Sequence, residues 1–222
     1  MISIAANACA RSVLRRQFIA PSSVGTRAKA NFTVGGSMTK SVLVPVADGS
    51  EEIEAVTIID TLRRAGASVV VASTSASLEV VMSRKVKLLA DMLLSEACKD
   101  DYDAIVLPGG LPGAAHLRDN QELTAMLKKQ AAAKRLVAAI CAAPVYVLLE
   151  HGLLESVKAT AHPSVSDKLP DQGPVSERVV VDGQFVTSRG PGTSLEFSLE
   201  LVKQLFGEAK SREVAGPMLP KP

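Results

Sequence analysis

The sequence predicts one α/β domain of the flavodoxin-like class, a doubly wound parallel sheet sandwich with helices covering both faces. Three observations predict this fold. From Ser41 onward, short apolar runs of strand length alternate with stretches of helical periodicity. The chain has 222 residues, 47% of them hydrophobic, which is enough for one full core. No internal repeat, low-complexity tract or second domain interrupts the alternation.

The first elements follow from their local patterns. The run SVLVPVA at 41–47 predicts a strand, and helical spacing predicts a helix over 51–65 that Gly66 ends. Four apolar residues fall on one face of this helix: Ile53, Val56, Ile59 and Leu62. A second strand is expected at 67–72, followed by a β-rich excursion.

The later elements continue the alternation. They are, in order, β-rich segments at 78–82 and 86–89, a strand at 103–107, a helix at 120–133, a strand at 136–140, a helix at 145–151 and a strand at 157–161. Asp182-Gly183 predicts a hairpin between 178–181 and 184–187, because this pair readily takes the positive φ angles of a type I′ turn. The last long helix is expected at 194–206, where Thr193 and Glu196 have capping-box spacing.

Cys141 occupies an abrupt junction between the apolar strand at 136–140 and the helix that follows Pro144. This is the strand, nucleophile and helix arrangement that hydrolases build around serine, here with cysteine. A thiol at a helix N-terminus is expected to have a lowered pKa and a larger thiolate fraction. The alternative is that Cys141 is a small buried apolar residue, as most free cysteines are.

Three strand ends carry unusual residues, and the carboxyl ends of parallel strands meet at one edge of a sheet. They are the 48–54 segment DGSEEIE, Pro108-Gly109-Gly110, and Cys141. Together they would bring a carboxylate, free N–H groups and a thiol to one place, as thiol addition to a carbonyl requires. Dipole complementation accounts for Glu51 and Glu52, whereas helix spacing leaves the direction of Glu54 open.

Other candidates also have two readings. Gly109 and Gly110 form either a donor nest or a tight turn. His162, which precedes a proline after a predicted strand, is either a pocket residue or a solvated loop residue. Arg189 belongs either to a turn and cap or to an anion-binding end.

Composition excludes several classes of function. The three cysteines, Cys9, Cys98 and Cys141, form no disulfide framework or paired metal motif, and the three histidines are dispersed, so we expect no metal site. Neither GxxxxGK[ST] nor GxGxxG occurs, which argues against a nucleotide site. With 3% aromatic residues and no long apolar run, the chain shows no sign of nucleic-acid binding or a membrane span.

Residues 1–38 differ from the rest of the chain. They hold five basic residues and no acidic one, whereas the remainder carries a net charge near −3. A basic, acid-free leader that contains Ser, Ala and an apolar stripe predicts an organelle transit peptide, mitochondrial or plastid, although a disordered basic tail is the alternative. Met38 could start a cytosolic form. The expected organisation is thus a leader at 1–38, a domain at 39–215 and a tail at 216–222.

A set of motifs resembles the DJ/PfpI family, in the branch of the Parkinsonism-associated deglycase and its bacterial and plant relatives. The matching stretches run in order over 39–214: GSEEIEA (49–55), LRRAG (62–66), LPGG (107–110), AAICAAP (138–144), His162-Pro163 and TSRGPGT (187–193). The combination of AAICAAP with SRGPGT is far more specific than any single motif. The resemblance implies a homodimer. It also implies that each subunit has a flavodoxin-like fold similar to that of class I glutamine amidotransferases.

The resemblance also implies roles for individual residues. The strained, oxidation-prone cysteine of the family falls on Cys141, its protonated pocket glutamate on Glu54 and its pocket histidine on His162. Its oxyanion-side donors fall on Gly110 and Ala142, beside Gly109. Its pocket arginines fall on Arg64, Arg84 and Arg189, one of them reaching the site from a partner subunit. Ala142 stands where the protease-like branch has histidine, which argues against peptidase activity.

Two functions are consistent with these residues. The first is a cofactor-independent glyoxalase or deglycase, in which Cys141 adds to methylglyoxal or glyoxal and Glu54 or His162 moves a proton before lactate or glycolate leaves. The second is a redox sensor or redox-regulated chaperone that signals through oxidation of Cys141. The same residues serve both functions.

Overall fold

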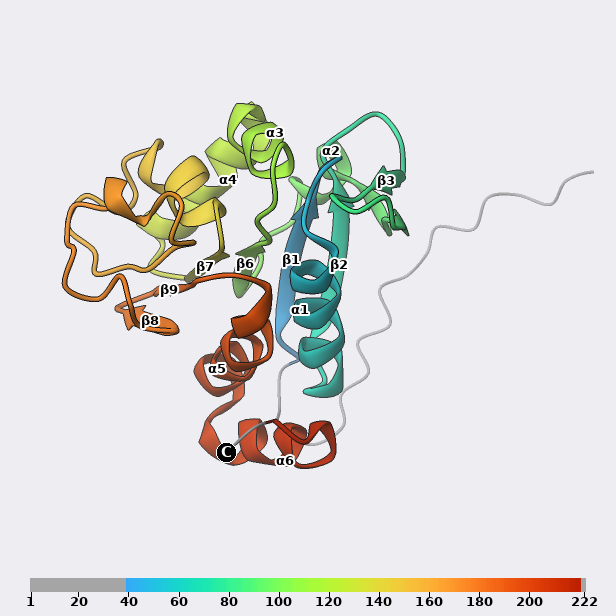
Figure 1. Cartoon of the computed structure of the whole chain (residues 1–222). Helices are drawn as coiled ribbons and strands as arrows, with labels where there is room; N and C mark the ends of the chain where they lie inside the picture. Colours follow the sequence, from blue (N-terminus) through green and yellow to red (C-terminus); the bar gives the residue numbers. More distant parts are fainter. Residues whose placement is uncertain (1–38, 221–222) are drawn as a thin grey trace, which may run out of the picture. The chain divides into compact units, whose positions relative to one another are not determined.

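A computed structural model describes residues 39–220, which form one α/β domain around a seven-stranded sheet (Figure 1). The sheet has the order β5-β2-β1-β6-β7-β9-β8. Its strands are β1 (Ser41–Val46), β2 (Ser68–Ser73), β5 (Met92–Leu93), β6 (Ala104–Leu107), β7 (Leu136–Ile140), β8 (Val179–Asp182) and β9 (Phe185–Ser188). β3 (Glu79–Val81) and β4 (Lys87–Leu89) pair separately as an antiparallel hairpin.

The strand order confirms the doubly wound fold. β1 pairs in parallel with β2 on one side and with β6 on the other, so the order of strands reverses between β1 and β6. β7 and β9 extend the parallel sheet, and β8 adds the one antiparallel pairing in it. The turn after β1 and the turn after β6 therefore flank the switch point, where ligands bind in this class of sheet.

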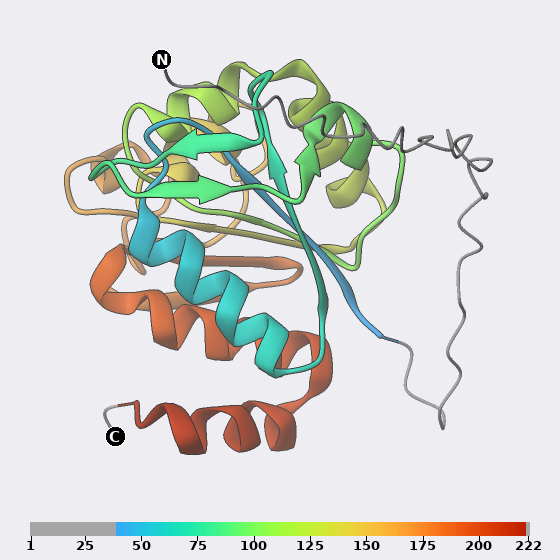
Figure 2. The same cartoon turned by 90° about the vertical axis from the view of Figure 1, so that its right-hand side faces the viewer.

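Helices cover both faces of the sheet (Figure 2). On one face α1 (Glu52–Arg64) and α5 (Ser194–Phe206) pack against each other, and α6 (Glu208–Met218) packs on α5. The other face carries α2 (Leu94–Ala97), α3 (Gly113–Asp119), α4 (Gln121–Ala132) and a π-helix at Pro144–Leu149. Alternation along β1 shows why: Val42 and Val44 join the first core and Leu43 joins the second.

Two expected β features are wrong in detail. Residues 157–161 form no strand, because side chains take up backbone donors there: Lys158 N donates to Asp182 Oδ2 and Thr160 N to Thr187 Oγ1. The hairpin forms, but Asp182 pairs with Phe185, so the two-residue turn is Gly183-Gln184. Gly183 has φ 58°, which suits a turn with glycine at its first central position.

Three helix predictions also change. In α1 the expected apolar face is buried only at its C-terminal end: Ile59 and Leu62 are buried, whereas Ile53 and Val56 are 55% and 50% exposed. At α5, Thr193 forms no capping box with Glu196; its hydroxyl bonds Ser188 and Gly190 instead. The helix after Cys141 is a π-helix. The sequence patterns also missed α2, α3 and α6.

The end of the domain extends past the expected boundary at 215. α6 continues to Met218, and Val214 from this helix is buried in the first core. The expected transit peptide at 1–38 lies outside the described residues and stays a prediction. Within residues 39–220, no helix combines the length and apolar character needed to cross a membrane.

Candidate active site

Cys141 stands in a strained turn between β7 and the π-helix. Its φ is 66°, in the left-handed region that non-glycine residues rarely adopt. Neighbouring strands and loops hold it there: Cys141 N donates to Ser188 O at 3.0 Å, and His162 N donates to Cys141 O at 2.8 Å. Strain of this kind persists only where the surroundings overdetermine the backbone, and it clusters at functional sites. The elbow read from the sequence is therefore present in the structure.

Two glycines after β6 allow the backbone to approach this elbow. A Cβ on Gly109 would lie 2.6 Å from Cys141 Cβ, so no side chain fits at 109. Gly110 has φ 86°, and a Cβ there would lie 2.6 Å from Glu51 N. The backbone N–H groups of Gly110 and Ala142 lower the pKa of the Cys141 thiol, so both are uncharged groups that favour negative charge on the sulfur.

Glu54 brings a carboxyl group to the same place from the first turn of α1. The residue is completely buried. Its Oε2 accepts a hydrogen bond of 2.7 Å from Gly109 N. Its Oε1 has no hydrogen-bond partner of good geometry, and the Cys141 thiol interacts with the same carboxyl group. The helix register left open by the sequence is settled: Glu54 faces the elbow.

Burial raises the pKa of both titratable groups; Glu54 further raises that of Cys141, whereas the thiol slightly lowers that of Glu54. Burial, partly offset by the Gly109 hydrogen bond, raises the pKa of Glu54 from 4.5 to about 7. Burial and then the charge of Glu54 raise the pKa of the Cys141 thiol to about 12, against the lowering effect of the backbone donors. The expected lowering by a helix dipole is wrong here because desolvation outweighs it. The fraction of Cys141 present as thiolate therefore depends on whether Glu54 is protonated.

His162 and Arg189 approach the elbow from two loops. The backbone of His162 bonds the Cys141 carbonyl, its Nδ1 lies 2.8 Å from Ser164 Oγ, and its ring lies against Gly190. Arg189 follows β9, and its Nη1 donates to Ser176 O at 3.3 Å, while its buried Nε has no partner within residues 39–220. Both side chains are half-buried.

Arg64 and Arg84 do not join the site within one chain. Arg64 lies in the last turn of α1 and pairs with Asp60 at 2.7 Å, with both side chains half-exposed. Arg84 is an exposed residue in the turn between β3 and β4. Its guanidinium bonds the carbonyl of Ser83. Of the expected arginines, Arg189 is the one whose backbone adjoins the elbow region.

Two acidic residues do more than the sequence indicated. Glu51 is the N-cap of α1, and its Oε2 accepts from Glu54 N at 2.8 Å. Glu52 is 8% exposed and accepts from Ser83 Oγ at 2.6 Å and Arg84 N at 2.7 Å, which attaches the β3–β4 turn to α1. The E-x-x-E spacing of residues 51 and 54 resembles a capping box and could have indicated the first contact.

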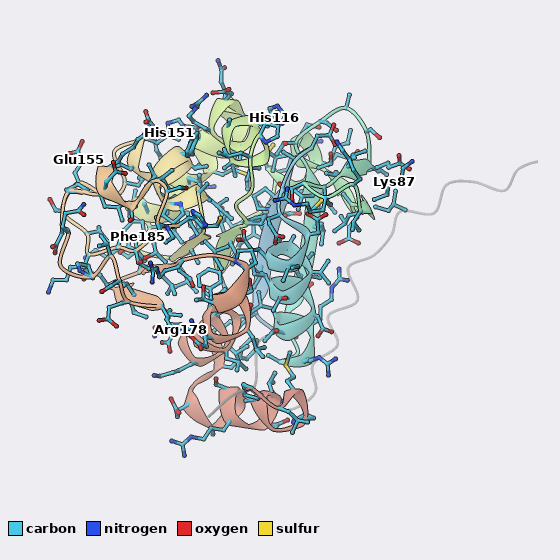
Figure 3. All side chains as sticks on the ribbon, viewed as in Figure 1. Lys87, His116, His151, Glu155, Arg178 and Phe185 are labelled. Atoms are coloured by element: carbon cyan, nitrogen blue, oxygen red, sulfur yellow. The ribbon has the colours of Figure 1, made fainter. Side chains whose placement is uncertain are left out.

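The remaining histidines lie outside this site. His116 belongs to α3 and bonds the Asp48 carbonyl, and His151 Nε2 lies 3.0 Å from both Thr124 Oγ1 and the Arg118 carbonyl (Figure 3). In the described part of the chain, no three potential ligands come close enough to hold a metal. The site offers a thiol, a carboxyl group of raised pKa and backbone donors, which suit covalent addition to a carbonyl.

Comparison with known proteins gives the same grouping. The model of the DJ-1/PfpI family matches residues 40–204. The chain is 56% identical to protein DJ-1 homolog B of Arabidopsis thaliana over 177 residues, which are 80% of this chain and 40% of that protein. It is 34% identical to the glutathione-independent glyoxalase DJR-1.2 of Caenorhabditis elegans, covering 80% of this chain and 94% of that protein.

Solved structures agree in fold. Toxoplasma gondii DJ-1 in its oxidized form has a TM-score of 0.79 and 48% identity, covering 83% of this chain and 100% of that one. Drosophila melanogaster DJ-1beta has a TM-score of 0.77 and 39% identity, covering 82% and 98%. The chain spans less than half the length of the Arabidopsis relatives DJ-1 homologs A and B.

Proposed function

We propose that this chain, which belongs to the DJ-1/PfpI family, is a glyoxalase or deglycase that needs no glutathione. The observation that carries the proposal is the position of Cys141, held at φ 66° between the Glu54 carboxyl group and the N–H groups of Gly110 and Ala142. A C. elegans relative that covers most of this chain is named for that activity. The substrate class is a small dicarbonyl, methylglyoxal or glyoxal.

The first step is covalent addition. The thiolate of Cys141 forms a bond to the aldehyde carbon of methylglyoxal, and the carbonyl oxygen takes up the negative charge. The N–H groups of Gly110 and Ala142 are the donors available to that oxyanion. A proton from Glu54 then gives a neutral hemithioacetal. The protein supplies the thiol that glutathione supplies in other glyoxalases.

The second step moves a proton between adjacent carbons. A base removes the proton from the former aldehyde carbon, and the neighbouring ketone carbon receives one, which leaves a thioester of lactate. Glu54 suits this exchange because its pKa of about 7 lets it both accept and donate near neutral pH. His162 is the alternative base. Water then cleaves the thioester, releasing lactate and the Cys141 thiol.

The test is direct. Purified protein is incubated with methylglyoxal in the absence of glutathione, and lactate is followed by a chiral assay. We expect many moles of lactate per mole of protein. Disappearance of methylglyoxal without lactate would reduce the reaction to stoichiometric capture by Cys141 and contradict the proposal. A parallel incubation with methylglyoxal-modified N-acetylarginine separates a deglycase from a glyoxalase, because only a deglycase releases the free amino acid derivative before methylglyoxal dissociates.

A homodimer completes the proposal, since Arg64 does not reach the site within its own chain. The exposed face of α1 is apolar at Ile53 and Val56, and Leu89 of β4 is 75% exposed. A cavity of about 260 Å³ lies between α1 and the β3–β4 hairpin. Burying this face against a second copy would place Arg64 at the edge of the interface. Sedimentation of the chain beside Val56→Asp tests this, and a monomeric wild type would contradict it.

A redox role is the second candidate, favoured by the same N–H groups. Oxidation of Cys141 by peroxide adds oxygen atoms to sulfur and releases water, and the sulfinate that results is an anion. Gly110 and Ala142 could donate to its oxygens, and a protonated Glu54 could do the same through Oε1. This role concerns a sensor or a redox-regulated chaperone, and it needs no turnover of dicarbonyls.

Targeting to an organelle is a separate proposal that rests on the composition of residues 1–38. Fusing residues 1–38 to a fluorescent reporter tests the proposal, and a diffuse cytosolic signal would contradict it.

A further inference from the structure

A closed ring of hydrogen bonds joins the start of α1 to the turn after β6. Glu54 N donates to Glu51 Oε2 at 2.8 Å, and Glu51 N donates to Gly109 O at 2.9 Å. Gly109 N donates to Glu54 Oε2 at 2.7 Å, which closes the ring. Each residue gives one hydrogen bond and receives one. The ring therefore fixes which oxygen of Glu54 is anchored and leaves Oε1 free of other partners.

The ring also reaches the nucleophile and its donors. Gly109 packs against Cys141 so closely that a Cβ there would lie 2.6 Å from the cysteine Cβ. A Cβ on Gly110, the next residue, would likewise lie 2.6 Å from Glu51 N. Glu51 thus contacts the glycine turn through its backbone and holds Glu54 through its side chain. It is the residue that links the two halves of the site.

The negative charge of Glu51 acts on the protonation of Glu54. The groups that face Glu54 are the thiol from the elbow after β7, the uncharged Gly109 N–H from the turn after β6, and the Glu51 carboxylate from its own helix. After burial, which is the larger cause, the Glu51 charge further raises the pKa of Glu54. The acidic residue among the largest causes for the Cys141 thiol is Glu54, whereas Glu51 is among those for Glu54, whose backbone N–H its carboxylate binds. The Glu51 carboxylate therefore disfavours charge on Glu54 more than charge on sulfur.

We propose that Glu51 is a positioning residue that, through this ring, biases the proton shared by Glu54 and Cys141 toward the carboxyl group and so raises the share of thiolate. Between about pH 7 and about pH 12 the pair holds one proton, mainly on sulfur, in exchange with a smaller fraction in which Glu54 holds it. A negative charge next to Glu54 shifts that balance toward protonated Glu54 and anionic Cys141. A role of Glu51 in catalysis rests on the proposed function, but its effect on the thiolate share of Cys141 does not.

The experiment measures alkylation of Cys141 by iodoacetamide at pH 8, where the pair holds a single proton. The background carries Cys9→Ser and Cys98→Ser, which leave Cys141 as the one thiol. Glu51→Gln keeps an acceptor for Glu54 N and removes the charge. We expect its alkylation to be about threefold slower, the effect of about half a pH unit from one charge across a partly solvated site. Glu51→Asp, which keeps charge and cap, should recover most of the rate.

A matched control comes from the opposite face of the sheet. Glu122→Gln removes an exposed carboxylate from the first turn of α4 and should leave alkylation unchanged. If Glu51 served only to hold the fold, Glu51→Gln would loosen the site and expose the thiol, so alkylation would become faster. An equal or faster rate in Glu51→Gln overturns the inference. If Glu51→Gln does not fold, Glu51→Asn replaces it, because Asn is a favoured N-cap without charge.

The two proposals fail separately. A slower alkylation in Glu51→Gln, together with no lactate from the wild type, keeps the role of Glu51 and removes the glyoxalase. Lactate from the wild type with equal alkylation rates keeps the glyoxalase and removes the role of Glu51.

Discussion

Cys141 and Cys98 are both half-buried free cysteines, yet their surroundings have little in common. Cys98 ends the short helix α2 with an ordinary φ of −67°, and its Sγ donates to the Ser95 carbonyl at 3.3 Å. Cys141 has φ 66° in an elbow, with a buried carboxyl group and backbone N–H groups around its sulfur. Exposure alone does not distinguish the two thiols. Backbone strain and the groups that meet the sulfur do.

The difference teaches what an active thiol requires in a buried place. Burial by itself raises the pKa of Cys141 and so opposes reaction. The site compensates through a neighbour that can take the proton and donors that can take the charge. Within residues 39–220 the side chain of Cys98 makes one hydrogen bond, to the Ser95 carbonyl, which accepts and cannot stabilise an anion. Substitutions that remove one part of this contrast at a time should therefore separate the two thiols.

The largest expected effect is on turnover when either sulfur is replaced. Cys141→Ser should lower lactate formation at least about a thousandfold, because a serine hydroxyl near neutral pH is a far weaker nucleophile than a thiolate. Cys98→Ser should retain the wild-type rate. Steady-state kinetics with methylglyoxal on both variants decide the matter. A Cys141→Ser protein with wild-type turnover would remove Cys141 from the mechanism.

The next effect concerns the carboxyl partner. Glu54→Gln keeps an acceptor for Gly109 N but cannot pass a proton, so turnover should fall about a hundredfold. Sulfinate should still form at Cys141, because the amide can donate to it. Glu122→Gln, in α4 on the other face of the sheet, is the control and should match the wild type. Glu52→Gln is a poorer control, since Glu52 holds the β3–β4 turn. Unchanged kinetics in Glu54→Gln would reduce Glu54 to a helix-start acid.

The raised pKa of Glu54 also predicts a dependence of stability on pH. Its pKa is about 7 when folded and near 4.5 when exposed, so between these values the folded state binds the extra proton. Stability contributed by this group therefore falls as pH rises from about 4.5 to about 7, by about 3 kcal/mol in all. Urea unfolding at several pH values should show this slope in the wild type and lose it in Glu54→Gln. Parallel curves for both proteins would contradict the buried, protonated carboxyl group.

The sequence predicted the architecture and the strand ends well, for a physical reason. Apolar runs such as 136–140 and the turn residues after them are local signals, and parallel strands bring their carboxyl ends together whatever the details. That is why the 48–54 segment, Gly109 and Cys141 could be grouped from their positions along the chain alone, whereas the family resemblance singled out Glu54. Residues 157–161 show the limit, because an apolar run forms a strand only if a partner strand is free to bond it.

The chemistry of the site was less predictable. The dipole argument at Cys141 uses one local term, whereas the pKa depends on desolvation by side chains from several distant segments. Periodicity also misplaced part of the buried face of α1: Ile59 and Leu62 are buried as expected, but Glu54 and Thr61 are buried while Ile53 and Val56 are exposed. Polar residues inside and apolar residues outside defeat a pattern that reads hydrophobicity. Glu54 is buried because it faces the elbow and accepts a hydrogen bond from Gly109, which the spacing of apolar residues cannot reveal.

A smaller effect is expected from the glycine that allows the elbow. Gly109→Ala would place a Cβ 2.6 Å from Cys141 Cβ and should destabilise the protein by about 1 to 3 kcal/mol. Gly216→Ala in α6 meets nothing within 4 Å and should be neutral or stabilising by about 0.5 kcal/mol. Chemical denaturation of the two variants provides the comparison. Equal stabilities would show that the elbow has room to relax.

The smallest expected effect is a preference between the two thiols in mild peroxide. Thiolate is the form that peroxide attacks, and burial lowers its amount at Cys141; the product, however, is a sulfur oxyanion, which meets the N–H groups of Gly110 and Ala142. Cys98 offers a carbonyl instead, which repels such a product. Stabilisation of the charge that forms should outweigh the smaller thiolate fraction, so Cys141 gains oxygen first, by about severalfold in rate. Peptide mapping by mass spectrometry after a peroxide titration measures the order. Oxidation of Cys98 first would show that desolvation dominates at Cys141. That result would count against the redox role more than against the glyoxalase, because addition of Cys141 to the dicarbonyl can be coupled to proton transfer with Glu54.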